Sequence, residues 1–267
     1  MQVAGRTVLI TGASSGIGAA TARAVARAGG RPLLLARRQE QLDELVAEIG
    51  AGARAYAVDC GDREAVARTA AQISEDVGVP DVLVNNAGAG RFLFFDETEP
   101  EEFEQMMAVP YFAAVYVTRA FLPAMIDRGS GHVVAVNTPI AFFAWPSAAG
   151  YAGARWALRG FCEALRADLR GTGIGVSQVV PAKVSSSYFE HNPGAEVGIP
   201  GISRIVGTLT PEQVADEIVD AIEHQRRLVL IPRMLRVMLF QARFFPRPTE
   251  RLLALTGRRR PARVREG

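Results

Sequence analysis

The chain has 267 residues, of which 49% are hydrophobic and 22% are charged, a composition typical of one soluble α/β domain or two small ones. No apolar run reaches about 18 residues. A strand is predicted from residue 7, so we expect neither a membrane-spanning helix nor a signal peptide. The net charge of +2 gives no sign of a nucleic-acid partner, because the excess of basic residues is confined to the C-terminal segment.

Apolar runs alternate with helical patterns along the chain. Strands are predicted at 7–11, 32–36, 54–58, 82–85, 132–136 and 175–180, and helices at 17–28, 39–49, 63–77, 101–128 around Pro110, and 151–169. Apolar strands separated by helices indicate a parallel sheet that is covered on both faces. The predicted fold class is therefore α/β, a doubly wound, Rossmann-like parallel sheet in a single domain with a C-terminal helical tail.

Residues 185–209 interrupt this rhythm. They are rich in Ser, Gly and Pro, and a loop of this length in a compact domain is typical of a lid or binding segment. Thr210 and Pro211 are predicted to start a helix over 212–222. We assign residues 1–232 to the domain and 233–267 to the tail.

A glycine-rich turn follows the first strand in the sequence TGASSGIG. Gly12, Gly16 and Gly18 lie between that strand and the first helix. Glycine lets the backbone approach a pyrophosphate, and a helix N-terminus supplies N–H donors and partial positive charge. This position in the chain predicts a dinucleotide site.

The end of the second predicted strand favours NADP(H) over NAD(H). NAD sites often place an acid there for the ribose 2′-hydroxyl, whereas this chain has Ala36 followed by Arg37 and Arg38. Guanidinium groups suit a 2′-phosphate. The alternative is that both arginines only begin a solvated helix.

The TGASSGIG turn, NNAG at 85–88 and the Tyr-x-x-x-cation spacing at 151–155 together resemble the classical short-chain dehydrogenase/reductase family. The resemblance runs from about residue 5 to 232. It implies that Asp59 meets the adenine, that 85–88 shape the ribose pocket, and that 181–184 hold the nicotinamide carboxamide with Ser186. The cofactor-binding residues predicted in this way are Gly12, Ser14, Ser15, Gly16, Ile17, Gly18, Arg37, Arg38, Asp59, Cys60, Asn86, Ala87, Gly88, Tyr151, Arg155, Pro181, Val184 and Ser186.

The resemblance also implies three catalytic residues. Tyr151 is the proton donor or acceptor, Thr138 stands at the position of the family serine, and Arg155 at that of the family lysine. Arginine keeps its charge but cannot release a proton. Pro110 stands at the position of the family asparagine, which holds a water in a proton relay, and it has no polar side chain.

Two classes of function therefore stay open. One is a redox enzyme that interconverts a carbonyl and an alcohol. The other is a protein that keeps the pocket but has non-redox chemistry, such as cyclisation or elimination, or that only binds a ligand.

Aromatic residues in two segments predict an apolar substrate. Residues 91–95 and 139–146 would lie at the carboxyl edge of the sheet and supply Phe92, Phe94, Phe95, Phe142, Phe143 and Trp145. A lipid-like, steroid-like or polyketide-like carbonyl or alcohol is expected. The alternative for about half of these rings is packing alone.

The tail is predicted to be a basic amphipathic helix. Arg233, Arg236, Arg243 and Arg247 share one face, among many apolar residues. Such a helix can pack on its own domain or a partner subunit, and 233–256 could instead contact a membrane peripherally. The family resemblance implies a homodimer or homotetramer packed through the helices at 111–128 and 151–169.

No metal site is predicted, because the cysteines and histidines are scattered. Cys60 and Cys162 are expected to be buried or half-buried thiols in a reducing cytoplasm. His132, His191 and His224 are expected in surface or turn positions.

Overall fold

The computed structural model describes residues 1–50, 52–185 and 198–260. These residues form a seven-stranded sheet in which every pairing is parallel, in the order β3-β2-β1-β4-β5-β6-β7. The strands are β1 (Thr7–Thr11), β2 (Arg31–Ala36), β3 (Arg54–Ala57), β4 (Val82–Asn85), β5 (Gly131–Val136), β6 (Ile174–Pro181) and β7 (Leu228–Ile231). The predicted doubly wound fold is confirmed. The sequence analysis did not predict the four-residue strand β7. Its short apolar run could not be distinguished from the apolar residues of the tail that follows.

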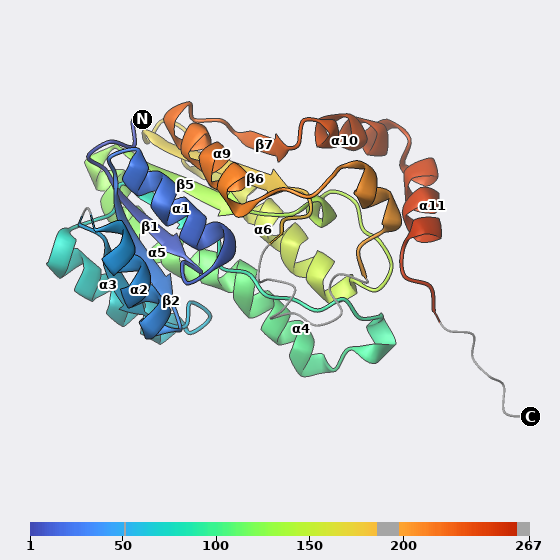
Figure 1. Ribbon diagram of the computed structural model, residues 1–267, viewed down its shortest axis with the longest axis horizontal. Helices are drawn as coiled ribbons and strands as arrows, with labels where there is room; N and C mark the ends of the chain where they lie inside the picture. Colours follow the sequence, from blue (N-terminus) through green and yellow to red (C-terminus); the bar gives the residue numbers. More distant parts are fainter. Residues whose placement is uncertain (51, 186–197, 261–267) are drawn as a thin grey trace, which may run out of the picture.

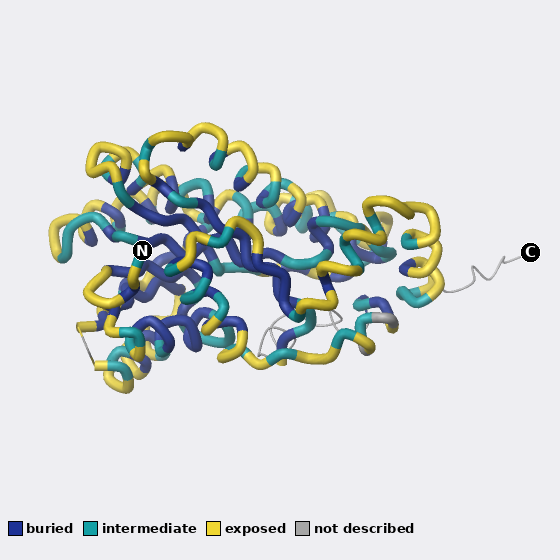
Figure 2. Tube along the Cα trace, turned by 90° about the horizontal axis from the view of Figure 1, so that it is seen from above, coloured by how far each residue is buried: buried dark blue, intermediate teal, exposed yellow. Residues whose placement is uncertain are grey.

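Helices cover both faces of the sheet, which lies buried between them (Figures 1 and 2). One face carries α1 (Gly16–Arg27), α2 (Gln39–Ile49) and α9 (Pro211–Glu223). The other carries α3 (Arg63–Val77), α5 (Ala113–Arg128) and α6 (Ala149–Asp168). Each face has its own apolar core, which explains why strands such as β1 and β5 are apolar at successive positions.

The order of the strands reverses between β1 and β4. The chain moves outward from β1 through β2 to β3, and then returns to β4 on the other side of β1. The connections that follow β1 and β4 therefore leave in opposite directions. Such a reversal opens a crevice at the carboxyl ends of the two strands.

The predicted helix starts have the expected local chemistry. The Thr210 side chain accepts from the Gln213 N–H, and Pro211 occupies the first helical position of α9. The Asp62 carboxylate accepts from the N–H groups of Glu64 and Ala65 at the start of α3. These caps satisfy donors that the first helical turn leaves unpaired.

The helical stretch predicted at 101–128 is interrupted at Pro110. Helix α4 (Pro100–Met107) leads into a π-helical segment, η2 (Ala108–Phe112), and then into α5. Val109 has non-helical angles, with φ −134° and ψ 111°. Among the described residues, 100–128 is the one helical stretch with the length and composition to cross a membrane. Its Val117, Phe121 and Met125 are buried in the core of the domain, as in a core helix.

The tail forms two helices rather than one. Helices α10 (Met234–Phe244) and α11 (Pro246–Thr256) lie at the end of the molecule opposite the N-terminus (Figure 1). Pro246 has no N–H to continue α10 and instead starts α11 at its first position. Arg247 therefore belongs to a different helix from Arg233, Arg236 and Arg243, so the single face predicted for all four is wrong.

The expected surface role of His132 is also wrong. Its side chain is fully buried on β5, and Nε2 lies 2.8 Å from the Ser177 hydroxyl, which donates to the Arg226 carbonyl at 2.6 Å. Because the hydroxyl proton is used there, Nε2 is the donor to Ser177, and Nδ1 has no partner among the described residues. Burial lowers the pKa of His132 to about 4. His224 is exposed as expected, and His191 lies outside the described residues.

We predict that this buried imidazole makes the fold sensitive to acid. The unfolded chain takes up the proton near pH 6.5 and the folded chain only near pH 4, so stability is full above 6.5 and is lost as pH falls toward 4. His132→Gln keeps a donor for Ser177 but cannot titrate. Between pH 6.5 and pH 4 the unmodified protein should lose unfolding free energy on the order of 3 kcal/mol through this group, and His132→Gln should not. Urea unfolding at a series of pH values measures the difference. His224→Gln is the control, and equal pH slopes for the two variants would contradict the prediction.

Candidate active site

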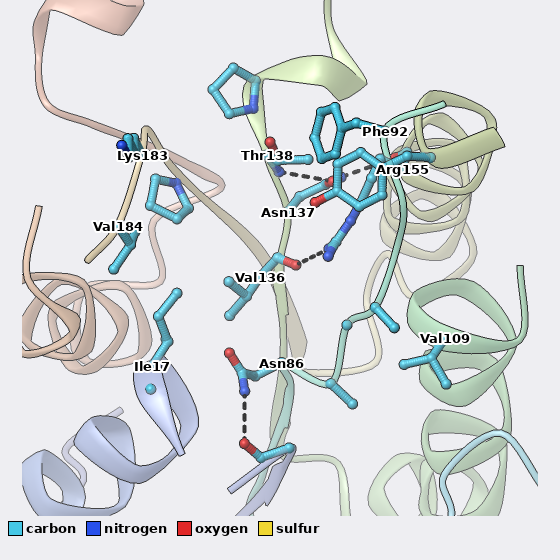
Figure 3. A pocket seen from close by; sticks show the side chains of 18 of the residues that line it. Ile17, Asn86, Phe92, Val109, Val136, Asn137, Thr138, Arg155, Lys183 and Val184 are labelled. Atoms are coloured by element: carbon cyan, nitrogen blue, oxygen red, sulfur yellow. Dashed lines mark hydrogen bonds between the residues drawn. The ribbon is translucent and has the colours of Figure 1, made fainter. Parts of the chain in front are cut away.

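A cleft of about 900 Å³ lies at the carboxyl ends of the strands, beside the reversal between β1 and β4 (Figure 3). All three predicted catalytic residues line it. Of the predicted cofactor residues, Gly18 lies behind the glycine turn and Ser186 is outside the described residues. The others also line the cleft. The structure thus brings together positions that are more than 170 residues apart in the chain, from Gly12 to Val184.

The glycine turn has the backbone geometry of an anion cradle. Gly12 and Gly16 have left-handed angles, with φ +67° and +53°, which favour glycine. A Cβ on Gly12 would lie 3.0 Å from the Ala87 Cα, and one on Gly18 would collide with the Gly12 carbonyl. The first turn of α1 contains no acidic residue and begins at the cleft. This turn fits the pyrophosphate of a dinucleotide.

Hydrogen bonds join the ends of β1 and β4 below the cleft. The Thr11 hydroxyl accepts from the N–H groups of Asn86 at 3.0 Å and Ala87 at 2.9 Å. The Asn86 side chain donates in return to the Thr11 carbonyl at 3.0 Å, next to Ile17 of α1 (Figure 3). These bonds set the floor of the cleft between the glycine turn and the segment that follows β4.

Two arginines and one thiol line the cleft near the ends of β2 and β3. Ala36, Arg37 and Arg38 line it at the end of β2, and Arg38 Nη2 donates to the Ser14 hydroxyl at 3.1 Å. This contact places a guanidinium across the glycine turn. Burial raises the pKa of the nearby Cys60 thiol to about 12, so the thiol is neutral and packs as an apolar group.

Tyr151 is held by close packing near the start of α6. Its side chain is buried, and its ring lies 5.1 Å from the Phe92 ring, centroid to centroid. Gly90 lies directly against this ring, so a Cβ at that position would collide with it. The segment after β4 therefore fixes the position of the phenol.

Arg155 lies one helical turn after Tyr151 and places its charge beside the phenol ring. Its guanidinium carbon is 5.1 Å from the ring centroid. Nη1 donates to the Val136 carbonyl at 3.1 Å, at the end of β5 (Figure 3). Nη2 lies against Gly88, where a Cβ would collide with it, and Nε has no partner among the described residues. The buried cation is thus fixed at the end of β5, and its Nε is a buried donor without a partner among the described residues.

Asn137 is a site residue that sequence reasoning missed. Its side-chain N–H group donates to the Arg155 carbonyl at 3.2 Å, and its side-chain oxygen accepts from the Thr138 N–H at 3.0 Å (Figure 3). It is buried and lines the cleft. Its position directly after an apolar strand was the available signal. It links the loop that carries Thr138 to the helix that carries Tyr151.

Comparison with known proteins identifies this arrangement. The model of the short chain dehydrogenase family matches residues 6–195. The chain belongs to the short-chain dehydrogenase family. It is 32% identical to 17-beta-hydroxysteroid dehydrogenase 13 of Rattus norvegicus over 263 residues, 96% of this chain and 84% of that protein. It is also 32% identical to epidermal retinol dehydrogenase 2 of Homo sapiens over 260 residues, 95% and 82% of the two chains.

Solved structures show the same architecture. A serine dehydrogenase complexed with NADP⁺ superposes with a TM-score of 0.75 at 27% identity, covering 84% of this chain and 94% of that one. Structures of this short-chain dehydrogenase fold bind NAD(P). The family and the named relatives support an oxidoreductase that acts between carbonyl and alcohol.

Pro110 lies beside the cleft but does not line it. It is buried in η2, one residue after the non-helical Val109 that lines the cleft. Proline has no side-chain donor or acceptor, so the water that an asparagine would hold has no side-chain partner at this position.

The substrate side of the cleft is apolar. Of the six aromatic residues predicted for it, Phe92, Phe143 and Trp145 line the cleft. Phe94 is buried away from it, Phe95 is 69% exposed, and Phe142 does not line it and packs against Val180 and Leu230. The tail helices complete the wall with Leu235 and Met238 from α10 and Leu253 from α11. The first predicted role of the tail, packing on its own domain, is therefore present in the structure.

We predict that Gly90→Ala disturbs Tyr151. The added methyl collides with the ring, and overpacking of this kind costs about 1–3 kcal/mol of stability. A displaced catalytic group can also lower turnover by about a hundredfold. Gly153→Ala is the matched control, because Gly153 lies in α6 with no atom within 4 Å of an added Cβ. Urea unfolding should show that Gly153→Ala is neutral or stabilising, and a stable Gly90→Ala protein would contradict the packing argument.

Proposed function

We propose that this protein is an NADP(H)-dependent oxidoreductase that interconverts a carbonyl and an alcohol on an apolar small molecule. The observation that carries the proposal is the fixed Tyr151–Arg155 pair, which lines the same cleft as the glycine turn. A proton-donating phenol and a dinucleotide cradle in one cleft are the two requirements of hydride transfer to a carbonyl.

The cofactor preference rests on charge at the end of β2. Ala36 supplies no carboxylate for a ribose 2′-hydroxyl, whereas Arg37 and Arg38 both line the cleft. The bond from Arg38 to Ser14 sets its guanidinium beside the glycine turn, where a 2′-phosphate would need a partner. The residues present therefore fit NADP(H).

The chain's own residues would then have distinct roles. The bound nicotinamide supplies the hydride. Tyr151 donates its phenolic proton to the developing alkoxide, and the Thr138 hydroxyl donates a hydrogen bond to the same oxygen. The Arg155 guanidinium stabilises the phenolate that remains. Since arginine holds its protons permanently, Tyr151 regains its proton from solvent in the cleft.

The apolar wall indicates the substrate class. Phe92, Phe143 and Trp145 line the cleft together with Leu235, Met238 and Leu253 of α10 and α11. The steroid and retinol named in the two relatives are apolar alcohols of this kind. We propose a lipid-like or steroid-like alcohol or ketone.

A second candidate is non-redox chemistry or ligand binding in the same cleft. Pro110 favours it, because it leaves no side-chain partner for a relay water, and Arg155 cannot pass a proton onward. In this candidate Tyr151 acts only as an acid or hydrogen-bond donor toward a ligand.

We also propose a homodimer or homotetramer that packs through α5 and α6. Aromatic side chains gather on this surface: Phe112 and Tyr116 stack 5.8 Å apart, and Trp156 is 46% exposed. Exposed aromatic groups of this kind are typical of subunit contacts.

The cofactor proposal predicts a difference between the two nucleotides. The Arg37→Gln/Arg38→Gln variant should bind NADPH about ten- to a hundredfold more weakly and NADH unchanged, because it loses only the partners of the 2′-phosphate. Nicotinamide fluorescence titration measures both. Arg31→Gln, at the other end of β2, is the control. Equal weakening for NADPH and NADH would count against the 2′-phosphate role.

The redox proposal predicts that Tyr151→Phe separates chemistry from binding. NADPH affinity should persist, whereas turnover of apolar ketones should fall by about 10²- to 10⁴-fold with the loss of the proton donor. Tyr116→Phe, on α5, is the matched control and should turn over normally. Undiminished turnover in Tyr151→Phe would exclude the tyrosine as donor. NADPH binding without turnover in the unmodified protein would support the second candidate.

A further inference from the structure

The outer face of the two tail helices is the most apolar exposed surface on the described part of the molecule. Seven of the thirteen exposed large hydrophobic side chains lie on α10, α11 or the residue between them. Phe240, Phe244, Phe245 and Leu255 are each 59% to 66% exposed. A concentration of this kind on a soluble surface marks an interaction site.

This face belongs to an anchored helix. Leu235 on the inner side of α10 is buried against Val180 and Leu230. Phe240 and Phe244 follow on the outer side at helical spacing, and their rings lie 4.5 Å apart. The inner side of α10 is therefore fixed to the domain, and the outer side presents an aromatic pair to the surroundings.

The same face is basic. Arg236 and Arg243 lie on one stripe beside the aromatic pair, and Arg233, Arg247 and Arg251 are exposed nearby. None of these five guanidiniums has a carboxylate partner among the described residues, and α10 and α11 contain one acidic residue, Glu250. An apolar strip edged by unpaired arginines matches lipid acyl chains edged by anionic headgroups.

A second copy of the chain fits this face less well. A two-fold contact places the same surface on both partners, so it would bring the arginine stripes of the two subunits close together. Like charges facing each other are repulsive. Anionic lipid supplies the opposite charge and the apolar contact together.

We propose that the outer face of α10 and α11 docks on an anionic membrane surface. The inner faces of the same helices contribute Leu235, Met238 and Leu253 to the cleft, so docking would bring the apolar wall next to the bilayer. Exchange of an apolar substrate with the membrane would follow, and this consequence alone rests on the function proposed above.

Vesicle flotation of the full chain tests the proposal. The protein should float with phosphatidylcholine vesicles that contain phosphatidylglycerol and remain behind with pure phosphatidylcholine. High salt should weaken the binding, because the arginines are exposed. Each arginine near an anionic surface contributes roughly fivefold, so Arg236→Gln/Arg243→Gln should bind on the order of 25-fold more weakly. Phe240→Ser/Phe244→Ser should lose at least about tenfold.

Matched variants elsewhere on the surface separate this face from general charge or hydrophobicity. Arg23→Gln/Arg27→Gln on α1 and Ile126→Ser on α5 should bind vesicles like the unmodified protein. NADPH titration of every variant checks that the fold is intact, and its result is independent of vesicle binding. Absence of flotation with anionic vesicles would overturn the proposal. A dimer that Phe240→Ser/Phe244→Ser converts to monomer in sedimentation would also overturn it and assign the face to a subunit contact.

Discussion

The Thr11 hydroxyl is the contact on which the site depends. It is almost fully buried and binds the backbone N–H groups of Asn86 and Ala87, which leave the sheet just after β4. At this point the chain order reverses, so the two segments would otherwise diverge with unpaired donors between them. A buried N–H without a partner costs about 1–3 kcal/mol of stability. The Thr11 hydroxyl avoids this cost for two N–H groups that have left the hydrogen-bonded sheet.

A few contacts connect the Thr11 hydroxyl to Tyr151. The segment after β4 carries Gly90 and Phe92, which pack against Tyr151. Asn137 then connects the loop after β5 to the backbone of α6, so the hydroxyl-bearing loop and the phenol-bearing helix move together. A misplacement of about 1 Å can lower a rate by about a hundredfold, and packing against the strands limits such a displacement.

The two substitutions at Pro110 and Arg155 have one shared consequence. The fold accommodates both residues, because Val109 beside Pro110 takes non-helical angles in the π-helical segment and the Val136 carbonyl accepts from the Arg155 guanidinium. Both also remove a group that could hold or pass a proton. The site therefore keeps a buried cation beside the Tyr151 ring, while neither Pro110 nor Arg155 carries a group that releases a proton.

The tail contacts both the segment after β4 and the cleft. Arg258 donates to the Phe92 carbonyl at 3.2 Å, and Arg260 pairs with Asp96 at 2.7 Å, so the end of the tail holds the segment that packs on Tyr151. α10 and α11 meanwhile form part of the apolar wall. The end of the tail thus supports the segment that packs on Tyr151, and the two tail helices contribute to the wall of the cleft.

The sequence by itself determined the parallel sheet and the glycine turn, because periodicity and local turn chemistry are encoded in neighbouring residues. Tyr151, Thr138 and Arg155 were identified as candidates through the resemblance to the family. The sequence did not reveal that Asn137 joins two elements, that His132 is buried, or that Pro246 divides the tail. Burial and pairing at these positions depend on residues far away in the chain, such as Ser177 for His132 and Arg155 for Asn137. Only the tertiary structure decided that the arginine of the Tyr-x-x-x-Arg pair bonds to the end of β5, since the carbonyl it uses comes from another element.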